Sequence, residues 1–201
     1  MIGTGGVGKT SLIEALGGHS PKKNQKFKTI LEYELSGDEF QMKLYEYPGY
    51  GCYNYNATKF WSEFRPSLSD TDMVIIMIDN RILKNDVEFL QNMQKYQLPF
   101  IIVRPKSDIA VNAILQSEKS LDYPDASEEA KKWAIQQLQE MVAADVKKVM
   151  GEENEEKLYV VNSHSLKDRN SNIFPTIDEK KLLEKLGVVH KEENSTDSPI
   201  Q

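Results

Sequence analysis

A run of residues near the start of the chain has the types and spacing needed to hold a phosphate group. Gly3-Thr4-Gly5-Gly6-Val7-Gly8-Lys9-Thr10 fits the pattern of a glycine, any four residues and then Gly-Lys-Ser/Thr. Glycines let the backbone turn tightly, so that successive N–H groups can point at phosphate oxygens. The Lys9 ammonium would neutralise the terminal phosphates, and the Thr10 hydroxyl would hold a Mg²⁺ ion. The predicted binding loop contains Gly3, Gly5, Gly6, Val7, Gly8, Lys9, Thr10 and Ser11.

The segment after this loop supports the same interpretation. A helix predicted from Ser11 to Leu16 would direct the positive end of its dipole at the bound anion. A flexible glycine-rich terminus is the competing interpretation of these residues. A phosphate loop normally follows a strand, and only Met1 and Ile2 precede this one, so we expect a truncated first strand.

Composition narrows the class of protein. The chain has 201 residues, of which 39% are hydrophobic, and this is enough for one α/β domain with a real core. Cys52 is the single cysteine, and no secretory or long apolar segment is present, which predicts a cytoplasmic protein. The net charge of −6 gives no support to nucleic acid as a partner. The three histidines and Cys52 show no zinc spacing, and Trp61 and Trp133 are predicted core residues.

Strands and helices alternate along the rest of the chain. Alternating apolar residues on both sides of Ser36-Gly37-Asp38 predict a hairpin, and a short helix is predicted over 58–65. The continuous apolar runs 73–78 and 100–103 are typical of strands buried in a parallel sheet. The remaining predicted elements are a helix over 85–97, a long helix over 127–150, a strand over 158–161, a loop over 162–165 and a last helix that ends at Gly187.

These elements predict a doubly wound α/β fold, with a mostly parallel sheet and helices on both of its faces. The predicted domain covers residues 1–187, and residues 188–201 form a predicted polar, disordered tail. Ligands of such folds bind beyond the carboxyl ends of the strands. Four loops at those ends carry candidate chemistry, and they are Gly3 to Thr10, Glu46 to Gly49, Pro105 to Asp108 and Ser163 to Ser165.

The order of these loops resembles a P-loop GTPase, and more narrowly the immunity-related GTPases, an interferon-inducible family of innate defence. The family's Asp-Leu-Pro-Gly motif is similar to Glu46-Tyr47-Pro48-Gly49, and its Arg-Thr-Lys-x-Asp motif is similar to Arg104-Pro105-Lys106-Ser107-Asp108. Its strand ending in Ser-Asn and its later Phe-Pro are similar to Asn162-Ser163-His164 and Phe174-Pro175. The resemblance covers the chain from Gly3 to about Gly187, and it implies binding of GTP and GDP with Mg²⁺ and slow GTP hydrolysis.

The resemblance also assigns roles to single residues. Lys9, Thr10 and Gly49 would act on the phosphates, with the Gly49 N–H donating to the γ-phosphate. The Asp108 carboxylate could accept two hydrogen bonds from guanine that adenine cannot offer. Lys106 would lie along the base, and the backbone of Ser163 and His164 would donate to the guanine carbonyl. The candidate metal-binding residues are Thr10, Thr29 and Glu46.

Three residues depart from the family pattern. Glu46 stands where the family has Asp, so its reach toward Mg²⁺ differs by one methylene. Pro105 lacks the side-chain hydrogen bond with which Thr or Asn braces the phosphate loop. Tyr50 replaces the water-orienting Gln of Ras-like enzymes, which predicts slow hydrolysis.

Two other interpretations compete with a slow GTPase switch. A nucleotide-impaired, truncated G-domain paralogue would act as an interaction module, and an ATP-using P-loop enzyme would leave Lys106 and Asp108 without a purpose. The resemblance implies a homodimer through the nucleotide face and peripheral attachment to intracellular membranes. The helices that attach family members to membranes flank their GTPase domain, and no segment of this sequence replaces them.

Overall fold

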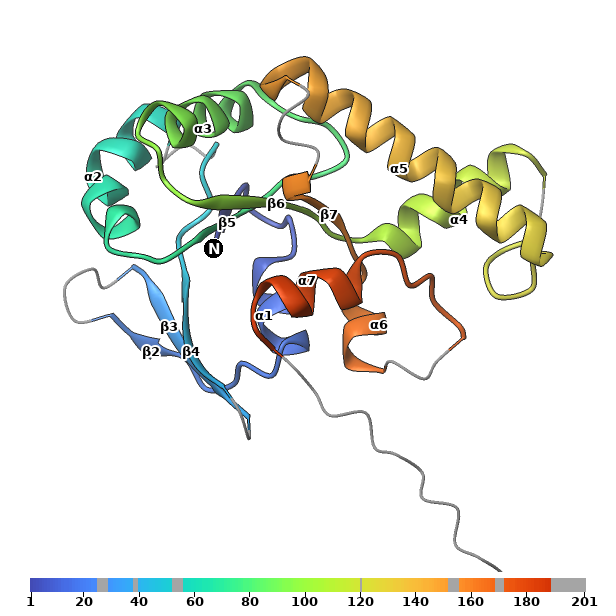
Figure 1. Ribbon diagram of the computed structural model, residues 1–201, viewed down its shortest axis with the longest axis horizontal. Helices are drawn as coiled ribbons and strands as arrows, with labels where there is room; N and C mark the ends of the chain where they lie inside the picture. Colours follow the sequence, from blue (N-terminus) through green and yellow to red (C-terminus); the bar gives the residue numbers. More distant parts are fainter. Residues whose placement is uncertain are drawn as a thin grey trace, which may run out of the picture.

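A four-stranded parallel sheet forms the centre of the protein, shown in the computed structural model in Figure 1. Its spatial order is β1 (Ile2–Gly3), β5 (Val74–Met77), β6 (Phe100–Arg104) and β7 (Leu158–Val160). All neighbouring pairs are parallel. The structure describes residues 1–24, 29–37, 40–51, 56–119, 121–151, 156–168 and 172–188.

Helices cover both faces of this sheet, as the sequence predicts (Figure 1). One face packs against α2 (Ala57–Ser69), α3 (Lys84–Lys95) and α5 (Glu128–Met150), with α4 (Ser107–Ser117) beside α5. The other face packs against α1 (Lys9–Ala15), α6 (Ser163–Lys167) and α7 (Glu179–Lys185). Because the chain alternates strands with covering helices, the doubly wound α/β fold is confirmed.

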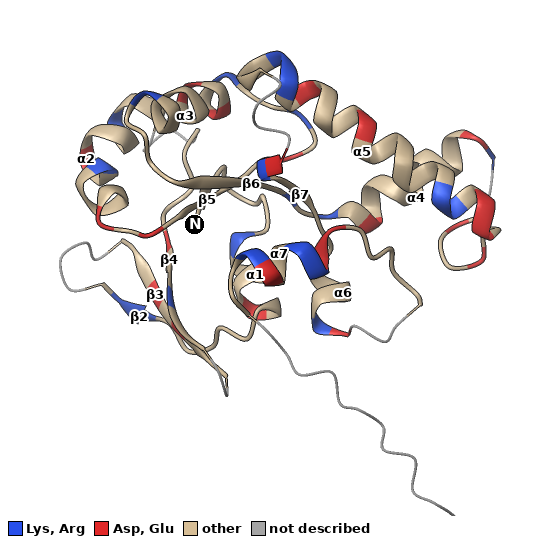
Figure 2. Ribbon diagram, in the orientation of Figure 1, with Lys and Arg blue, Asp and Glu red and all other residues tan. Residues whose placement is uncertain are grey.

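Alternation along the central strands divides the interior into two cores. Ile76 and Ile102 face the α2, α3 and α5 side, whereas Ile75 and Ile101 face the α1 and α7 side. Successive side chains of a strand point to opposite faces, so strands buried on both faces must be apolar throughout. Figure 2 agrees with this reasoning, since the β5 ribbon carries no charged residue while charges line the outer helices.

A second, antiparallel sheet contains β2 (Lys22–Lys23), β3 (Leu31–Ser36) and β4 (Gln41–Glu46). The predicted β3–β4 hairpin is confirmed, with Leu31 opposite Glu46 and Ser36 opposite Gln41. The chain after β4 runs beside β1, because the Met1 nitrogen donates to the Tyr45 carbonyl at 2.5 Å and the Tyr47 N–H donates to the Met1 carbonyl at 3.1 Å. The first strand is short, as expected, and contains only Ile2–Gly3.

Several element boundaries differ from the sequence prediction. Helix α2 continues through Pro66 to Ser69 because Phe64 and Leu68 are buried on its packing face. Helix α4 begins at Ser107, inside the loop predicted from Pro105 to Asp108, and its N-cap residue Lys106 has a left-handed backbone with a φ of 60°. The predicted loop after β7 is instead the short helix α6, which the Asn162 side chain caps.

The predictions for the two tryptophans and for the start of the C-terminal tail hold only in part. Trp61 is buried as predicted, but Trp133 is 41% exposed on α5 and is not a core residue. Val188 is buried in the core beneath α7, so the packed chain extends to at least this residue. The rest of the predicted tail lies outside the described residues. In the described part of the chain, no helix has the length and apolar character needed to cross a membrane.

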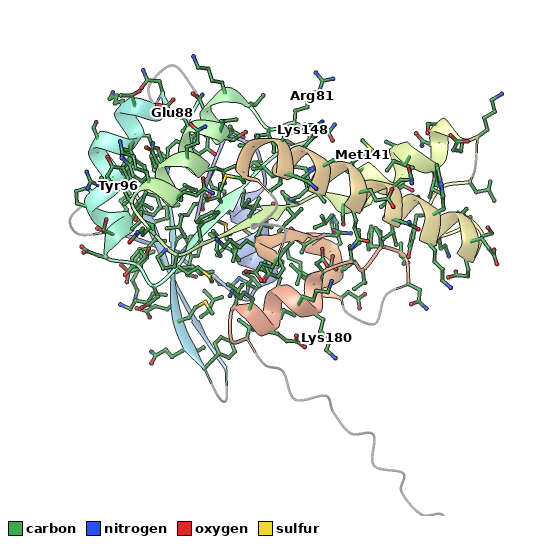
Figure 3. All side chains as sticks on the ribbon, turned by 45° about the horizontal axis from the view of Figure 1, so that its top comes forward. Arg81, Glu88, Tyr96, Met141, Lys148 and Lys180 are labelled. Atoms are coloured by element: carbon green, nitrogen blue, oxygen red, sulfur yellow. The ribbon has the colours of Figure 1, made fainter. Side chains whose placement is uncertain are left out.

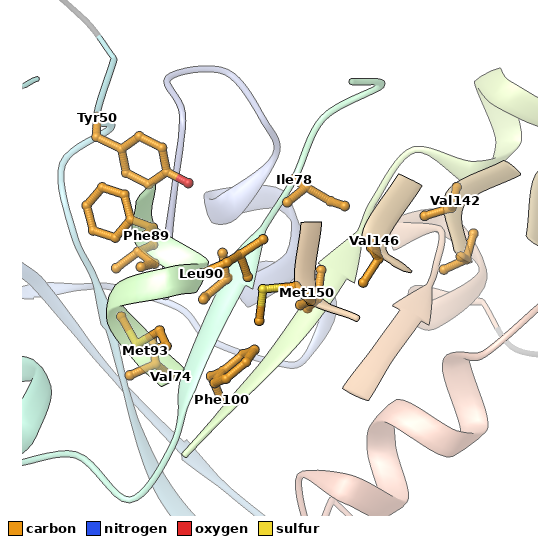
Figure 4. Close-up of a cluster of buried hydrophobic side chains, with 14 of the residues drawn as sticks. Tyr50, Val74, Ile78, Phe89, Leu90, Met93, Phe100, Val142, Val146 and Met150 are labelled. Carbon is orange, nitrogen blue, oxygen red and sulfur yellow. The ribbon is translucent and has the colours of Figure 1, made fainter. Parts of the chain in front are cut away.

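Aromatic side chains dominate the core between the sheet, α2 and α3. Phe89 is fully buried, stacks on Tyr50 with ring centroids 4.2 Å apart, and meets Phe60 edge-on at 5.1 Å. Figure 4 shows Phe89 and Tyr50 at one end of this cluster, with Val146 and Met150 of α5 toward the other. Aromatic pairs of this kind add to the free energy gained from burying apolar surface.

We predict that Phe89→Ala lowers the free energy of unfolding by about 3–5 kcal/mol, because it leaves a cavity among rigid aromatic rings. Urea denaturation followed by circular dichroism measures this loss. Met141→Ala is the control, since Met141 is 59% exposed on α5 (Figure 3) and its change should be within about 0.5 kcal/mol. Equal losses for the two variants would contradict this description of the core.

Candidate functional site

The loop between β1 and α1 has an open, glycine-lined backbone. Gly6 and Gly8 have φ angles of 76° and 111°, which side-chain-bearing residues rarely adopt. A Cβ atom added at Gly5 or Gly6 would meet nothing within 4 Å, so this stretch is open to a ligand. The loop therefore has the backbone geometry in which N–H groups can surround an anion.

The Lys9 ammonium is held inside this loop. It donates to the carbonyls of Gly3 at 3.1 Å and Thr4 at 3.0 Å, and the residue is 7% exposed. Burial lowers the pKa of Lys9, and the nearby Glu46 carboxylate opposes that change. The structure thus fixes a positive charge where the sequence places the phosphate-neutralising group.

The loop after β4 passes directly against the phosphate loop. A Cβ atom on Gly49 would lie 2.7 Å from the Gly5 nitrogen and 2.8 Å from the Gly5 Cα atom. No side chain fits in that space, so the close approach of the two backbones requires glycine. Gly49 therefore lies next to the predicted phosphate site, as its proposed contact with the γ-phosphate needs.

The Glu46 carboxylate lies at the meeting point of α1, β3 and β4. Its Oε1 atom accepts a hydrogen bond from the Thr10 hydroxyl at 2.8 Å, and its Oε2 atom accepts one from the Tyr33 hydroxyl at 2.9 Å. Burial, followed by the bond to Glu46, raises the pKa of Tyr33 to about 12, so this hydroxyl stays a donor at neutral pH. Sequence reasoning treated Tyr33 only as an alternating strand residue, and only the hairpin register shows that it reaches Glu46.

Thr10 and Glu46 fit the oxygen chemistry of Mg²⁺, which is usually held by one or two protein oxygens, water and substrate phosphates. Their oxygens are already adjacent, at 2.8 Å. Thr29, the third predicted metal-binding residue, lies on an exposed turn before β3. Within the described ranges, it makes no hydrogen bond to Thr10 or Glu46, so the structure brings together two of the three candidates.

The loop between β6 and α4 packs on the phosphate loop. The Lys106 ammonium donates to the Gly6 carbonyl at 2.9 Å, and the Pro105 side chain would lie 3.9 Å from a Cβ atom placed on Gly8. Asp108 lies in the first turn of α4 and is partly exposed. Lys106, one of the predicted base-recognising residues, therefore lies beside the phosphate loop, although 100 positions separate it from Gly6 in the sequence.

The loop after β7 joins this group of loops through the backbone. The Ser107 N–H donates to the Val161 carbonyl at 3.2 Å. The buried Asn162 side chain accepts a hydrogen bond from the His164 N–H at 2.8 Å, so this N–H already has a partner within the chain. The sequence analysis did not predict Asn162 as a helix cap, because it placed a loop over 162–165 where the structure has α6.

Arg104 connects the ends of β5 and β6 beneath these loops. It is 4% exposed and donates to the Pro105 carbonyl at 2.8 Å and to Asn80 Oδ1 at 2.7 Å, with the Asp79 carboxylate 4.0 Å away. Burial lowers the pKa of Arg104, and Asp79 opposes that effect. The hydrogen bonds of Arg104 therefore stabilise the loop between β6 and α4, and we assign the residue no contact with the ligand.

A cavity of about 460 Å³ lies elsewhere, between β4 and the start of β5. Among its lining residues are Met42, Leu44, Asp72 and Val74. Of the described residues of the four loops, only Tyr47 lines it, and no residue of the phosphate loop does. The cavity is therefore separate from the candidate site, which consists of surface loops at the carboxyl edge of the sheet.

Sheet and loops together define the class of the protein. A phosphate loop, a glycine that contacts it and a Lys-Ser-Asp loop meet at one edge of a parallel sheet, which is the arrangement of a P-loop G domain. A family model described as "50S ribosome-binding GTPase" matches residues 1–106, more than half of the chain. The chain therefore belongs to the family of 50S ribosome-binding GTPases.

Two individual proteins are also similar to this chain. The probable GTP-binding protein EngB of Kosmotoga olearia is 29% identical over 120 residues, which are 54% of this chain and 62% of that protein. This chain thus matches less than two thirds of the relative's length. The FeoB G-domain of Methanococcus jannaschii has a TM-score of 0.47 and 15% identity, over 93% of this chain and 92% of that one. The narrower resemblance to immunity-related GTPases is not shown, and EngB points to another family.

We predict that Arg104→Met destabilises the protein by about 1–3 kcal/mol, because it removes hydrogen bonds beneath the site and leaves the buried Pro105 carbonyl without its donor. Urea denaturation measures the change. Arg81→Met is the matched control, since the exposed Arg81 lies in the neighbouring loop and points away from the protein (Figure 3). A loss no larger than that of the control would show that Arg104 does not support these loops.

Proposed function

We propose that this protein binds GTP and GDP with Mg²⁺ and hydrolyses GTP slowly, as a molecular switch. The hydrogen bond between Lys106 and the Gly6 carbonyl is the observation that carries the proposal. It joins the loop that would recognise guanine to the loop that would hold phosphate. One nucleotide could therefore contact both.

The phosphate side of the site supports this proposal through charge and backbone donors. Lys9 would neutralise β- and γ-phosphate charge, and the open glycine backbone would donate N–H groups to the same oxygens. The Gly49 N–H would donate to the γ-phosphate. Thr10 and Glu46 would hold Mg²⁺, which supplies positive charge to the phosphates when it is bound.

Selection of guanine would come from Asp108 and Lys106. A carboxylate accepts hydrogen bonds only, so Asp108 suits the ring N–H and amino group of guanine. The hydrogen bond from the Lys106 ammonium to the Gly6 carbonyl supports this role, because it keeps the side chain beside the phosphate loop. Ser163 would donate to the guanine carbonyl from the neighbouring loop.

Slow hydrolysis is supported by the direction of the Tyr50 side chain. Tyr50 is 1% exposed, stacks on Phe89 and donates to the Asp86 carboxylate at 2.7 Å. Burial raises the pKa of the Tyr50 hydroxyl and also that of Asp86. Because this side chain is held in the core, it cannot orient a water molecule from the position where Ras-like enzymes use Gln.

An interaction module with impaired nucleotide binding is the second candidate function. One observation favours it, because Pro105 lies beside the phosphate loop near Gly8 and has no side-chain hydrogen bond with which to brace it. Such a module would keep the fold but show no response to nucleotide. The following measurement separates the two functions.

We predict that GDP with Mg²⁺ raises the melting temperature, since a ligand stabilises only the state that binds it, and that Lys9→Met abolishes this rise. Met keeps the apolar stem of Lys9 without its charge. Lys148→Met, on the exposed surface of α5 (Figure 3), is the control and should respond like the wild type. An unchanged melt of the folded wild type would reject nucleotide binding and support the interaction module.

A second prediction concerns the base. Asp108→Asn should weaken GDP binding by at least about tenfold, because an amide replaces one acceptor with a donor. It should strengthen binding of xanthosine diphosphate, whose carbonyl replaces the amino group of guanine. Isothermal titration calorimetry measures both affinities. If the variant binds GDP as the wild type does, Asp108 does not contact the base.

The proposals for biological partners have less support than the proposal for nucleotide binding. The family description names the 50S ribosome, and co-sedimentation with ribosomal subunits in each nucleotide state tests that partner. The innate-defence role, the homodimer through the nucleotide face and peripheral attachment to intracellular membranes have only the motif resemblance in their support. A cytoplasmic location fits either role.

A further inference from the structure

Tyr33 and Glu46 are diagonal neighbours on one face of the β3–β4 hairpin. Leu31 pairs with Glu46 and Tyr33 pairs with Leu44, so Tyr33 lies one pair further along the same face. Diagonal positions of this kind are about 7–8 Å apart, within reach of a tyrosine side chain. The Tyr33 ring is anchored in the core with Leu35 and Leu44, and the residue is 3% exposed.

The hydroxyl of Tyr33 and that of Thr10 hold the two oxygens of one carboxylate. Tyr33 donates to Oε2 at 2.9 Å, and Thr10 donates to Oε1 at 2.8 Å. A glutamate side chain has one more rotatable bond than an aspartate, so it loses more conformational freedom when it is fixed. The bond from the rigid, buried Tyr33 limits that freedom and keeps Glu46 against Thr10.

We propose that Tyr33 is a positioning residue of the Mg²⁺ site, which holds the longer Glu46 side chain so that it and Thr10 present their oxygens together. The inference rests on the proposed function, because it concerns the metal that accompanies the nucleotide. Tyr33 itself does not touch the ion. Its role is that of an outer hydrogen-bond partner that orients a metal ligand.

Tyr33→Phe tests this role, since it removes the hydroxyl and keeps the buried ring. The measurement is the Mg²⁺ concentration that half-maximally slows release of a fluorescent GDP analogue. We expect Tyr33→Phe to need roughly tenfold more Mg²⁺ than the wild type, while its release rate in excess chelator is unchanged. Tyr159→Phe is the matched control, because Tyr159 is buried in the same core cluster and makes no hydrogen bond to Glu46 in the described part of the chain.

Glu46→Asp provides a second, independent variant in case Tyr33→Phe does not fold. The shorter side chain cannot reach Thr10 and Tyr33 together, so we expect a similar rise in the Mg²⁺ requirement. In the double variant the two effects should not add, because they remove the same interaction. Additive effects would overturn the inference, and so would a wild-type Mg²⁺ requirement in Tyr33→Phe.

The outcome also separates this inference from the proposed function. If the wild type releases GDP at the same rate with and without Mg²⁺, or does not bind GDP, the proposed Mg²⁺-dependent site fails and the role of Tyr33 fails with it. If the wild type depends on Mg²⁺ and Tyr33→Phe has the same requirement, only the role of Tyr33 fails.

Discussion

The contact between the Lys106 ammonium and the Gly6 carbonyl is the constraint on which the site depends. It joins two loops that are far apart in the sequence and lie at the same edge of the parallel sheet. The Ser107 N–H bond to Val161 adds the loop after β7 to the same group. Because parallel strands end at a common edge, three short loops can surround one ligand without any long insertion.

The sheet can hold these loops in place because it is packed on both faces. β5 is buried along its whole length, and side chains of alternate residues contribute to separate cores. Close-packed cores resist small displacements of their strands. The loops that begin at the ends of β5 and β6 therefore start from fixed positions. Arg104 then links those two ends through Asn80 and the Pro105 carbonyl.

Two residues that depart from the usual GTPase motifs, Glu46 and Tyr50, are held by side chains from other parts of the chain. Glu46 has a longer side chain than aspartate, and the Tyr33 hydroxyl reaches its second oxygen. Tyr50, instead of pointing toward the phosphate loop, is stacked on Phe89 and bonded to Asp86 at the start of α3. The loop that contains Gly49 therefore contacts α3 directly through Tyr50. A movement of that loop would change the contacts of Tyr50 with Phe89 and Asp86 in the helix.

The sequence by itself determined the fold class, the hairpin, the buried strands and the residues of the candidate phosphate loop, because these follow from local periodicity and from glycine geometry. It could not determine α4, whose start depends on a left-handed Lys106 held against the phosphate loop, or the continuation of α2 past Pro66. Nor could it show that Tyr33, Asn162 and Arg104 support the site. Their roles depend on cross-strand register and on contacts between distant segments, and only the tertiary structure decides those.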